Sequence, residues 1–259
     1  MDSLNTYWAD RSALEWQIEL GADEAICDTP TDRYDIPDKL AKPAARPTPA
    51  AVDDTPEPAT VDPVAEARQL AAAAQDLDAL QAALATFEHC TLKRGARNTI
   101  FGHGDPAARM MVISEAPDRD ADRAGTPFAG PPMQLLDRMF DAIGMGVKAA
   151  DGAQIYLASP TPWRSPAQSQ PKDLAMTKPF LERHITLANP DIVILMGNTA
   201  CQMLLGQGGV SRLRGTWTEV LGRPALPMLH PAALMRTPTA KRDAWADLLA
   251  LQAKLKDMS

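Results

Sequence analysis

The sequence predicts an α/β protein in which helices cover both faces of a central parallel sheet. Four short apolar runs are typical of buried strands, and they occupy residues 108–113, 154–158, 192–196 and 226–229. Helical patterns alternate with these runs, at residues 133–143, 173–187, 198–205 and 240–254. Strands that alternate with helices pair in parallel, so the four runs predict a four-stranded parallel sheet.

The 259 residues are expected to form one large core with an N-terminal appendage. Residues 1–28 predict a short amphipathic helix, and residues 29–66 predict a Pro/Ala-rich linker. An Ala- and Leu-rich helix from Pro63 to about Glu88 leads into the core domain, which we assign to residues 67–259. Two interpretations of the N-terminal helix stay open: it docks on its own core or is solvated, or it binds a protein partner.

The acidic charge of the chain lies in its N-terminal part. Residues 1–66 hold 15 acidic and 5 basic side chains, whereas residues 67–259 hold 18 acidic and 21 basic ones. The mildly basic core is compatible with DNA as a partner. Three cysteines without a CxxC pair give no disulfide framework, and no apolar run has the length of a membrane span or the pattern of a signal peptide. A cytoplasmic protein is therefore expected.

Two motifs at the ends of predicted strands carry the candidate chemistry. The sequence Ser-Glu-Ala-Pro at 114–117 follows the first apolar run, and Thr-Pro-Phe-Ala-Gly at 126–130 leads into the next helix. Far along the chain, the run at 226–229 is followed by His230 and a proline. Ligands of parallel α/β sheets bind at the carboxyl ends of the strands. The carboxylate of Glu115 and the imidazole of His230 are therefore expected to converge in one site.

Eight segments in a fixed order resemble motifs of the uracil-DNA glycosylase superfamily, and particularly of its family 4 enzymes, which carry an iron–sulfur cluster. They are N-T-I-F-G-H-G-D-P at 98–106, S-E-A-P with its continuation at 114–122, G-T-P-F-A-G at 125–130, Q-L-L-D at 134–137, I-Y-L-A-S at 155–159, R-L-R-G-T-W at 212–217, H-P-A-A-L-M-R at 230–236 and K-R-D-A-W-A-D-L at 241–248. The resemblance covers roughly residues 84–253. It implies a three-layer α/β/α sandwich that removes uracil, or a related deaminated base, after the nucleotide flips out of DNA.

The resemblance also implies roles for individual residues. His230 would hydrogen-bond the O2 oxygen of the departing base, and Glu115 would orient water or stabilise the cationic sugar, unless it only caps a turn. Phe128 would stack on the flipped base, unless it is a core residue. Ala116, Pro117 and Ser159 complete the expected base pocket. The expected DNA contacts are Gly130, Gln134, Arg214, Leu234, Met235, Arg236, Lys241 and Arg242, with Leu234 or Met235 as an apolar wedge and a solvated surface charge as the alternative for each cation.

Several positions depart from the family pattern. Ser114 and Asp118 stand where the family has glycine, so their side chains are expected to narrow the cavity or repel DNA. Prolines at 131 and 132 are expected to stiffen the loop before the next helix. Ser159 replaces the asparagine that reads uracil, and a hydroxyl cannot make both contacts of an amide. We therefore expect weaker or broader base selection than in a typical family member.

The cysteine positions depart as well. Family 4 enzymes hold their cluster with four cysteines, whereas this chain has Cys90 at one of these positions and Phe87, Trp163 and Lys178 at the others. One thiolate cannot hold an iron–sulfur cluster, so neither this cofactor nor another metal is expected.

Two functions remain open on the sequence. The first is a DNA repair glycosylase, expected to be a monomer, that hydrolyses the N-glycosidic bond without an iron–sulfur cluster. The alternative is a catalytically impaired paralogue that acts as a DNA- or protein-binding module. A hydrolase of small nucleobase compounds is a third class, but it leaves the Leu-Met-Arg sequence at 234–236 unexplained.

Overall fold

The computed structural model describes residues 11, 16–17, 62–150, 153–165 and 170–258. The chain divides into two compact units, Met1–Pro56 and Glu57–Ser259. In the first unit the described positions are Arg11, Trp16 and Gln17, which are helical. The rest of the predicted helix at 1–28, and the predicted linker up to residue 61, lie outside the described residues.

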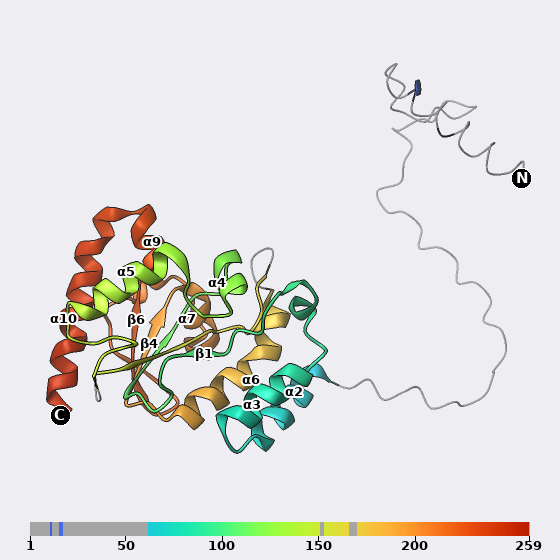
Figure 1. The fold of residues 1–259 in the computed structure, drawn as a ribbon, viewed down its shortest axis with the longest axis horizontal. Helices are drawn as coiled ribbons and strands as arrows, with labels where there is room; N and C mark the ends of the chain where they lie inside the picture. The colour runs from blue at the N-terminus through green and yellow to red at the C-terminus, as the bar shows by residue number, and fades with distance from the viewer. Residues whose placement is uncertain (1–10, 12–15, 18–61, 151–152, 166–169, 259) are drawn as a thin grey trace, which may run out of the picture. The chain divides into compact units, whose positions relative to one another are not determined.

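A six-stranded sheet forms the centre of the second unit (Figure 1). Its strands are β1 (Gly102–His103), β2 (Met110–Ile113), β3 (Ile155–Ala158), β4 (Ile192–Met196), β5 (Thr218–Val220) and β6 (Arg223–Met228), in the order β1-β3-β2-β4-β6-β5. The four predicted strands are the parallel ones, β3, β2, β4 and β6. The structure adds β1 and β5 as antiparallel edges. These edge strands have two and three residues and are partly exposed, so they carry no apolar run that the sequence could reveal.

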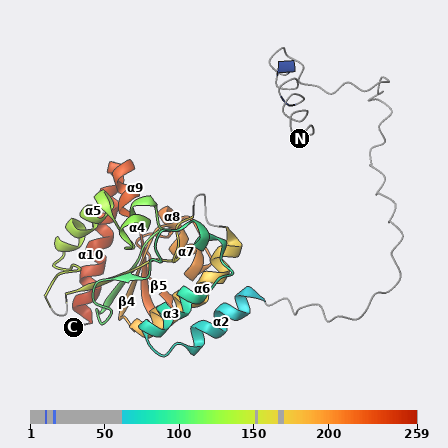
Figure 2. The ribbon, with the colours of Figure 1, turned by 45° about the vertical axis from the view of Figure 1, so that its right-hand side comes forward.

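Helices form the outer layers. They are α2 (Pro63–Ala73), α3 (Leu77–Thr86), α4 (Arg119–Ala124), α5 (Gly130–Asp141), α6 (Pro171–Ala188), α7 (Asn198–Leu205), α8 (Val210–Leu213), α9 (Pro231–Arg236) and α10 (Lys241–Asp257), with 3-10 turns η1 (Thr91–Gly95) and η2 (Pro238–Ala240). Figures 1 and 2 show α5, α9 and α10 on one side of the sheet and α2, α3 and α6 on the other. This arrangement confirms the predicted α/β fold with a covered parallel sheet. None of the described helices is long and apolar enough to cross a membrane.

The central strands are apolar on both faces. Every residue of β2, β3 and β4 is buried, because helices cover each side of the sheet. Their register pairs Met110 of β2 with Ile155 of β3 and with Ile192 of β4. The carboxyl ends of the three strands therefore lie side by side at one edge of the sheet.

Two helix boundaries differ from the sequence prediction. The single helix expected at 63–88 is two helices, because Asp76 starts α3 by accepting a hydrogen bond from the Ala79 amide at 2.7 Å. The Arg183 side chain also binds the Ala74 carbonyl in the break, at 2.7 and 3.1 Å. The prolines at 131 and 132, expected to stiffen a loop, instead form the first turn of α5, where amide groups lack helical partners and proline is tolerated.

A buried histidine links the sheet to α6. His184 Nε2 lies 2.9 Å from the Tyr156 hydroxyl, and its ring stacks on Phe101 at a centroid distance of 4.0 Å. Burial lowers the pKa of His184 from 6.5 to about 3, because the charged imidazolium would lose its hydration. His184 is therefore neutral in the folded protein throughout the physiological pH range.

This histidine is expected to make stability depend on pH. Between the unfolded pKa of 6.5 and the folded pKa of about 3, the unfolded chain binds a proton that the folded chain does not. The free energy of unfolding should therefore fall as pH drops below 6.5, by about 1.4 kcal/mol per unit from this group. Urea unfolding of the wild type and of His184→Gln at pH 7.5 and 5.5 measures the effect. Equal losses in the two proteins would contradict it.

Candidate active site

The candidate site lies where the order of the sheet reverses. The chain passes from β2 to β3 on one side and then to β4 on the other, so the carboxyl ends of β2 and β4 flank a topological switch point, where ligands bind in open α/β sheets. Glu115 follows β2, Gly197 follows β4, and His230 lies just beyond β6. The structure therefore brings the two predicted catalytic residues to one edge of the sheet, with Gly197 at the end of the strand between them.

Backbone amides fix the Glu115 carboxylate. Its Oε2 accepts a hydrogen bond from the Asn198 amide at 2.6 Å, and its Oε1 accepts from the Thr199 amide at 2.9 Å. Oε1 also accepts from the Ala116 amide at 3.2 Å. The carboxylate thus caps the N-terminus of α7, where it satisfies amides that lack helical partners. Of about four acceptor sites on a carboxylate, three are used, which leaves one on Oε2 for a water or a ligand.

Gly197 makes this contact possible. A Cβ at this position would lie 2.2 Å from Glu115 Oε2, and its φ of +112° is a conformation that L side chains rarely adopt. The neighbouring Asn198 extends the network, because its Oδ1 accepts from the amides of Gly209 and Val210 at 3.0 and 2.8 Å. Neither Gly197 nor Asn198 is predicted as part of the site, although a Gly-Asn pair directly after a buried strand is a signal for it.

His230 is the N-cap of α9. Its Nδ1 accepts a hydrogen bond from the Ala232 amide at 3.2 Å. An amide only donates, so Nδ1 carries no proton and the neutral ring carries its proton on Nε2. Burial lowers the pKa of His230 from 6.5 to about 4, although the charges of Glu115 and Asp118 act in the opposite direction. The ring is therefore a neutral donor through Nε2 at physiological pH.

Phe128 is buried against His230. The two rings are stacked, with centroids 5.0 Å apart and planes 6° from parallel, which is the distance of rings in direct contact. The cavity beside them holds about 20 Å³, room for about one water, and is lined by Glu115, Ala116, Asp118, Ala121, Pro127, Phe128, Ala129, Pro132 and His230. Pro117 is buried next to this lining. One of the two faces of the Phe128 ring, which is predicted to stack on a base, is thus covered by the imidazole.

A larger cavity shares Glu115, Ala116, Asp118 and His230 with this small one. It holds about 240 Å³, and Glu115, Asn198, His230 and Arg236 are among its lining residues. Asp118 lines it too, while its carboxylate caps α4 through the amides of Asp120 and Ala121 at 3.0 and 2.8 Å. The aspartate that replaces a family glycine therefore has a structural role in starting α4.

Ser159 is not part of this arrangement. Its hydroxyl donates to the Thr161 carbonyl at 2.6 Å, and the residue lines a separate small cavity with Phe101 and His184. Ser114 is likewise buried, with its hydroxyl donating to the Glu115 carbonyl at 2.9 Å. Neither side chain reaches the cavities around Glu115 and His230, so the expectation that Ser114 narrows the site does not match its position.

The residues predicted to contact DNA fall into two groups. Gly130, Gln134, Met235, Arg236, Lys241 and Arg242 are exposed. Leu234 is 1% exposed and packs in the core, so of the two candidate wedges Met235, 45% exposed, is the one on the surface. Arg214 binds the buried carboxylate of Asp247 with two hydrogen bonds of 2.9 and 2.5 Å. Its guanidinium therefore binds within the fold, to a partner 33 residues away that no local sequence pattern indicates.

The residues at the four cluster positions do not fit an iron–sulfur cluster. Phe87, Cys90 and Trp163 lie buried in one hydrophobic cluster with residues of α2, α3 and α6, while Lys178 pairs with Glu182 on the surface. Burial raises the pKa of Cys90 to about 11, so its thiol is protonated, and its Sγ lies 3.7 Å from Asp173 Oδ1. Among the described residues, no group of three or more His, Cys, Asp or Glu side chains is arranged to hold a metal ion.

Comparison with known proteins identifies the family of this chain. The type-4 uracil-DNA glycosylase of Sulfurisphaera tokodaii is 25% identical over 180 residues, which cover 64% of this chain and 79% of that protein. The enzyme of the same name from Thermotoga maritima is 27% identical over 150 residues (57% and 77%), and that from Archaeoglobus fulgidus is 25% identical over 182 residues (67% and 90%). The family model described as "Uracil DNA glycosylase superfamily" matches residues 101–249, which is more than half of the chain and includes both candidate catalytic residues. The chain therefore belongs to the uracil-DNA glycosylase superfamily and is distantly homologous to its type-4 enzymes.

Proposed function

We propose that this protein is a DNA glycosylase that hydrolyses the N-glycosidic bond of uracil, or of a related deaminated base, without an iron–sulfur cluster. The observation that carries the proposal is the pairing of a neutral, donating His230 with a fixed Glu115 carboxylate around one cavity at the switch point of the sheet. Family membership supplies the class of reaction, and these two groups supply the chemistry that it needs.

The proposed reaction breaks the bond between C1′ of deoxyribose and N1 of the base. The bonding electron pair leaves with the base, and the negative charge that develops on O2 accepts a hydrogen bond from His230 Nε2–H. The sugar becomes cationic and is stabilised by the Glu115 carboxylate. A water that donates a hydrogen bond to the open acceptor site on Oε2 attacks C1′, and its second proton is lost to solvent. The base anion takes up a proton from solvent, so the products are the neutral free base and an abasic site.

The proposed DNA-binding surface consists of predicted contact residues whose side chains are exposed. Met235 on α9 is the apolar side chain placed to fill the gap left by a flipped nucleotide. Arg236, Lys241 and Arg242 are exposed at the end of α9 and the start of α10, where they are placed to contact phosphates. Because the imidazole of His230 covers one face of Phe128, a flipped base that stacks on this ring uses the opposite face or displaces the imidazole.

The proposal that the protein lacks an iron–sulfur cluster rests on the side chains at the cluster positions of the family. A single protonated thiol and two large apolar side chains occupy positions where the family uses thiolates. Iron analysis and the visible absorbance of anaerobically purified protein test this part of the proposal. Stoichiometric iron with the brown absorbance of a cluster would contradict it.

One observation favours the alternative, a catalytically impaired DNA- or protein-binding module. The cavity at Phe128 has room for about one water, and Ser159 donates its hydroxyl to its own loop. A protein that cannot reopen this cavity would bind DNA without excising a base. A protein partner for residues 1–28 belongs to the same alternative.

The deciding experiment is alkaline cleavage of labelled oligonucleotides that contain uracil, single-stranded or paired with guanine or adenine. Cleavage by the wild type that is reduced in His230→Ala and Glu115→Ala supports the glycosylase. DNA binding without cleavage supports the impaired paralogue. A panel of hypoxanthine, xanthine and thymine substrates tests base selection; strict uracil specificity would contradict the broader selection expected from Ser159.

Gly197→Ala is expected to lower excision at least tenfold, because its Cβ displaces the Glu115 carboxylate from α7. Gly206→Ala is the matched control, since Gly206 also has a positive φ of +70° but meets nothing within 4 Å. Both substitutions should cost stability, by about 1–3 kcal/mol from backbone strain. Equal excision rates in the two variants, measured in single turnovers, would show that the Gly197–Glu115 contact does not position a reacting group.

A further inference from the structure

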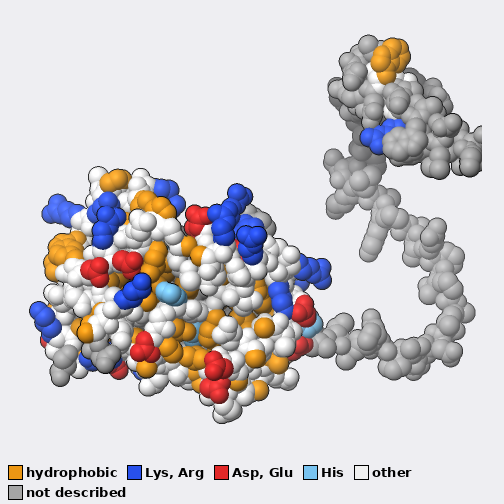
Figure 3. Space-filling model, in the orientation of Figure 1, with side chains coloured by type: hydrophobic (Ala, Val, Ile, Leu, Met, Phe, Trp, Pro, Cys, Tyr) orange, Lys and Arg blue, Asp and Glu red, His pale blue; other side chains and the backbone are white. Residues whose placement is uncertain are grey.

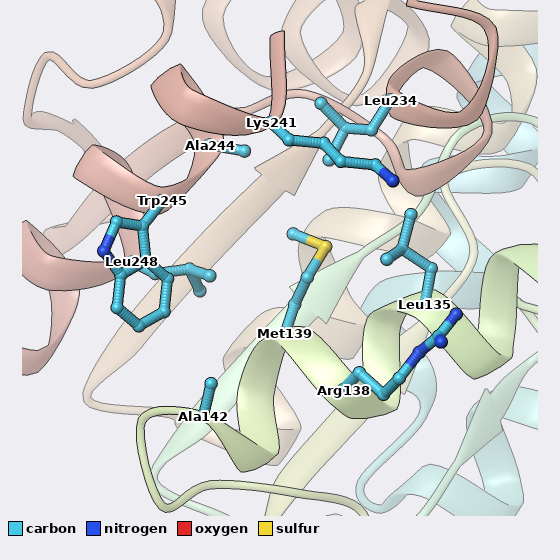
Figure 4. Close-up of a pocket in the computed structure, with 9 residues that line it drawn as sticks. All are labelled: Leu135, Arg138, Met139, Ala142, Leu234, Lys241, Ala244, Trp245 and Leu248. Carbon is cyan, nitrogen blue, oxygen red and sulfur yellow. The ribbon is translucent and has the colours of Figure 1, made fainter. Parts of the chain in front are cut away.

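A second large cavity lies apart from the catalytic pair, between α5, α9 and α10. It holds about 340 Å³, and Figure 4 shows the nine residues that line it: Leu135, Arg138, Met139, Ala142, Leu234, Lys241, Ala244, Trp245 and Leu248. The residues from α5 and from α10 recur at spacings of three and four, so each helix turns one continuous face toward the cavity. We call this cavity the α5–α10 groove.

The floor of the groove is apolar and buried, while one wall is an exposed aromatic ring. Leu234, Ala244 and Leu248 are at most 3% exposed, whereas the Trp245 side chain is 44% exposed. Figure 4 shows the indole beside Leu248 at one end of the groove, with Met139 in the middle. A large aromatic ring left open to solvent above a buried apolar floor is a surface for a flat, apolar ligand.

The polar groups of the groove are cationic. Lys241 and Arg138 line it at the end opposite Trp245, and no carboxylate is among its lining residues (Figure 4). The acidic residues of the same helices, Asp137, Asp141, Asp243, Asp247 and Asp257, lie outside the lining. Figure 3 shows apolar side chains exposed over α10 at the left edge of the domain, with Lys and Arg side chains above them and Asp or Glu side chains beside them. The occupant that complements this lining has a flat apolar part and a negative charge.

The groove is close to the proposed catalytic site. α9 begins directly after His230 and contributes Leu234 to the groove, and its six residues span about 9 Å. Successive phosphates on one DNA strand advance by about 3.4 Å along a duplex, so the groove lies within roughly three nucleotides of His230. A volume of about 340 Å³ is at the small end of ligand pockets and suits one base rather than a helix of a partner protein.

We propose that the α5–α10 groove holds one unpaired nucleotide of the DNA strand, with its base against Trp245 and its phosphate near Lys241 and Arg138. This inference rests on the proposed function for the choice of DNA as the ligand. Bases of any kind stack on aromatic side chains, so the groove contributes affinity for single-stranded DNA without reading its sequence. It adds a binding residue, Trp245, that lies outside the flipped-base cavity.

The test is the affinity of the full chain for a labelled 15-nucleotide oligothymidine, which contains no uracil, measured by fluorescence anisotropy. Trp245→Ala is expected to weaken binding by about tenfold, the typical effect of losing one stacked base. Trp245→Phe keeps a ring and should stay within about threefold of the wild type. Leu249→Ala is the matched control, because Leu249 is equally exposed one turn further along α10 and does not line the groove.

A second pair of variants tests the phosphate contact. Lys241→Ala should weaken binding and reduce the slope of log affinity against log salt by about 0.7, the value for one phosphate contact on a single strand. Lys256→Ala removes the same charge from the far end of α10 and should change neither. Thermal unfolding of every variant separates loss of binding from loss of folding.

Unchanged oligothymidine binding in folded Trp245→Ala, or an equal loss in Leu249→Ala, would overturn the inference. Binding of an amphipathic Glu/Leu peptide through Trp245, without binding of oligothymidine, would also overturn the inference. The occupant of the groove would then be an acidic protein helix. Uracil excision measured in parallel keeps the two proposals separate. A wild type that excises no base but binds oligothymidine through Trp245 would overturn the glycosylase proposal and support the groove proposal. Normal excision together with oligothymidine binding that does not depend on Trp245 would support the glycosylase proposal and overturn the groove proposal.

Discussion

Replacing His230 with alanine is expected to lower the single-turnover rate of uracil excision by about 10²–10³-fold, the cost of removing one donor to a developing oxyanion. The reason lies in the tautomer that the structure imposes. Nδ1 accepts the Ala232 amide, so the proton of the neutral ring sits on Nε2, the atom that faces a departing base in the proposed reaction.

Two controls separate this catalytic effect from a structural one. His230→Asn keeps an acceptor for the start of α9, so it should fold like the wild type while losing the imidazole donor. His103→Ala removes an exposed histidine on β1 and should leave the rate unchanged. A His230→Ala protein that excises uracil at the wild-type rate would remove His230 from the mechanism.

The pH profile provides an independent check on the same residue. Burial lowers the pKa of His230 to about 4, so the neutral ring persists from pH 8 down to about pH 5. The excision rate of the wild type should show no inflection near 6.5, the ordinary pKa of histidine. A rate that rises as pH falls through 6.5 would instead indicate catalysis by the imidazolium.

Replacing Arg214 with alanine is expected to destabilise the fold by about 3–5 kcal/mol, the usual cost of leaving a buried charge without its partner. Arg214 Nε and Nη2 donate to the two carboxylate oxygens of Asp247, and Nη2 also donates to the Asp243 carbonyl at 2.6 Å. Asp247 is 2% exposed, and burial raises its pKa although the guanidinium beside it acts in the opposite direction. The pair joins the segment after α8 to α10.

Urea unfolding measures this effect, with Arg212→Ala as the control. Arg212 is an exposed cation on α8, and its loss should change stability by less than about 0.5 kcal/mol. The double variant Arg214→Met/Asp247→Leu should recover most of the stability, because it leaves no unpaired buried charge. If Arg214→Ala keeps wild-type stability but reduces the salt dependence of DNA binding, the sequence-based assignment of Arg214 to phosphate contact holds instead.

The candidate site could be predicted from sequence only where its residues follow strands. Glu115 and His230 were found because each follows an apolar run, and parallel strands end at the same edge of a sheet. Asn198 and Gly197 were missed as site residues because their role depends on a carboxylate more than 80 positions away. The resemblance to the family implies a place for Ser159 in the base pocket, but its hydroxyl instead donates to the Thr161 carbonyl.

The sequence by itself determined the four parallel strands, the helices between them and the edge of the sheet that carries the chemistry. Local patterns suffice for these features, since a run of buried apolar residues is stable only when both of its faces are covered. The tertiary structure alone decided the two edge strands, the pairing of Arg214 with Asp247, the stacking of Phe128 on His230 and the groove beside Trp245. Each of these depends on which side chains meet across long sequence separations, and that is fixed only when the layers pack together.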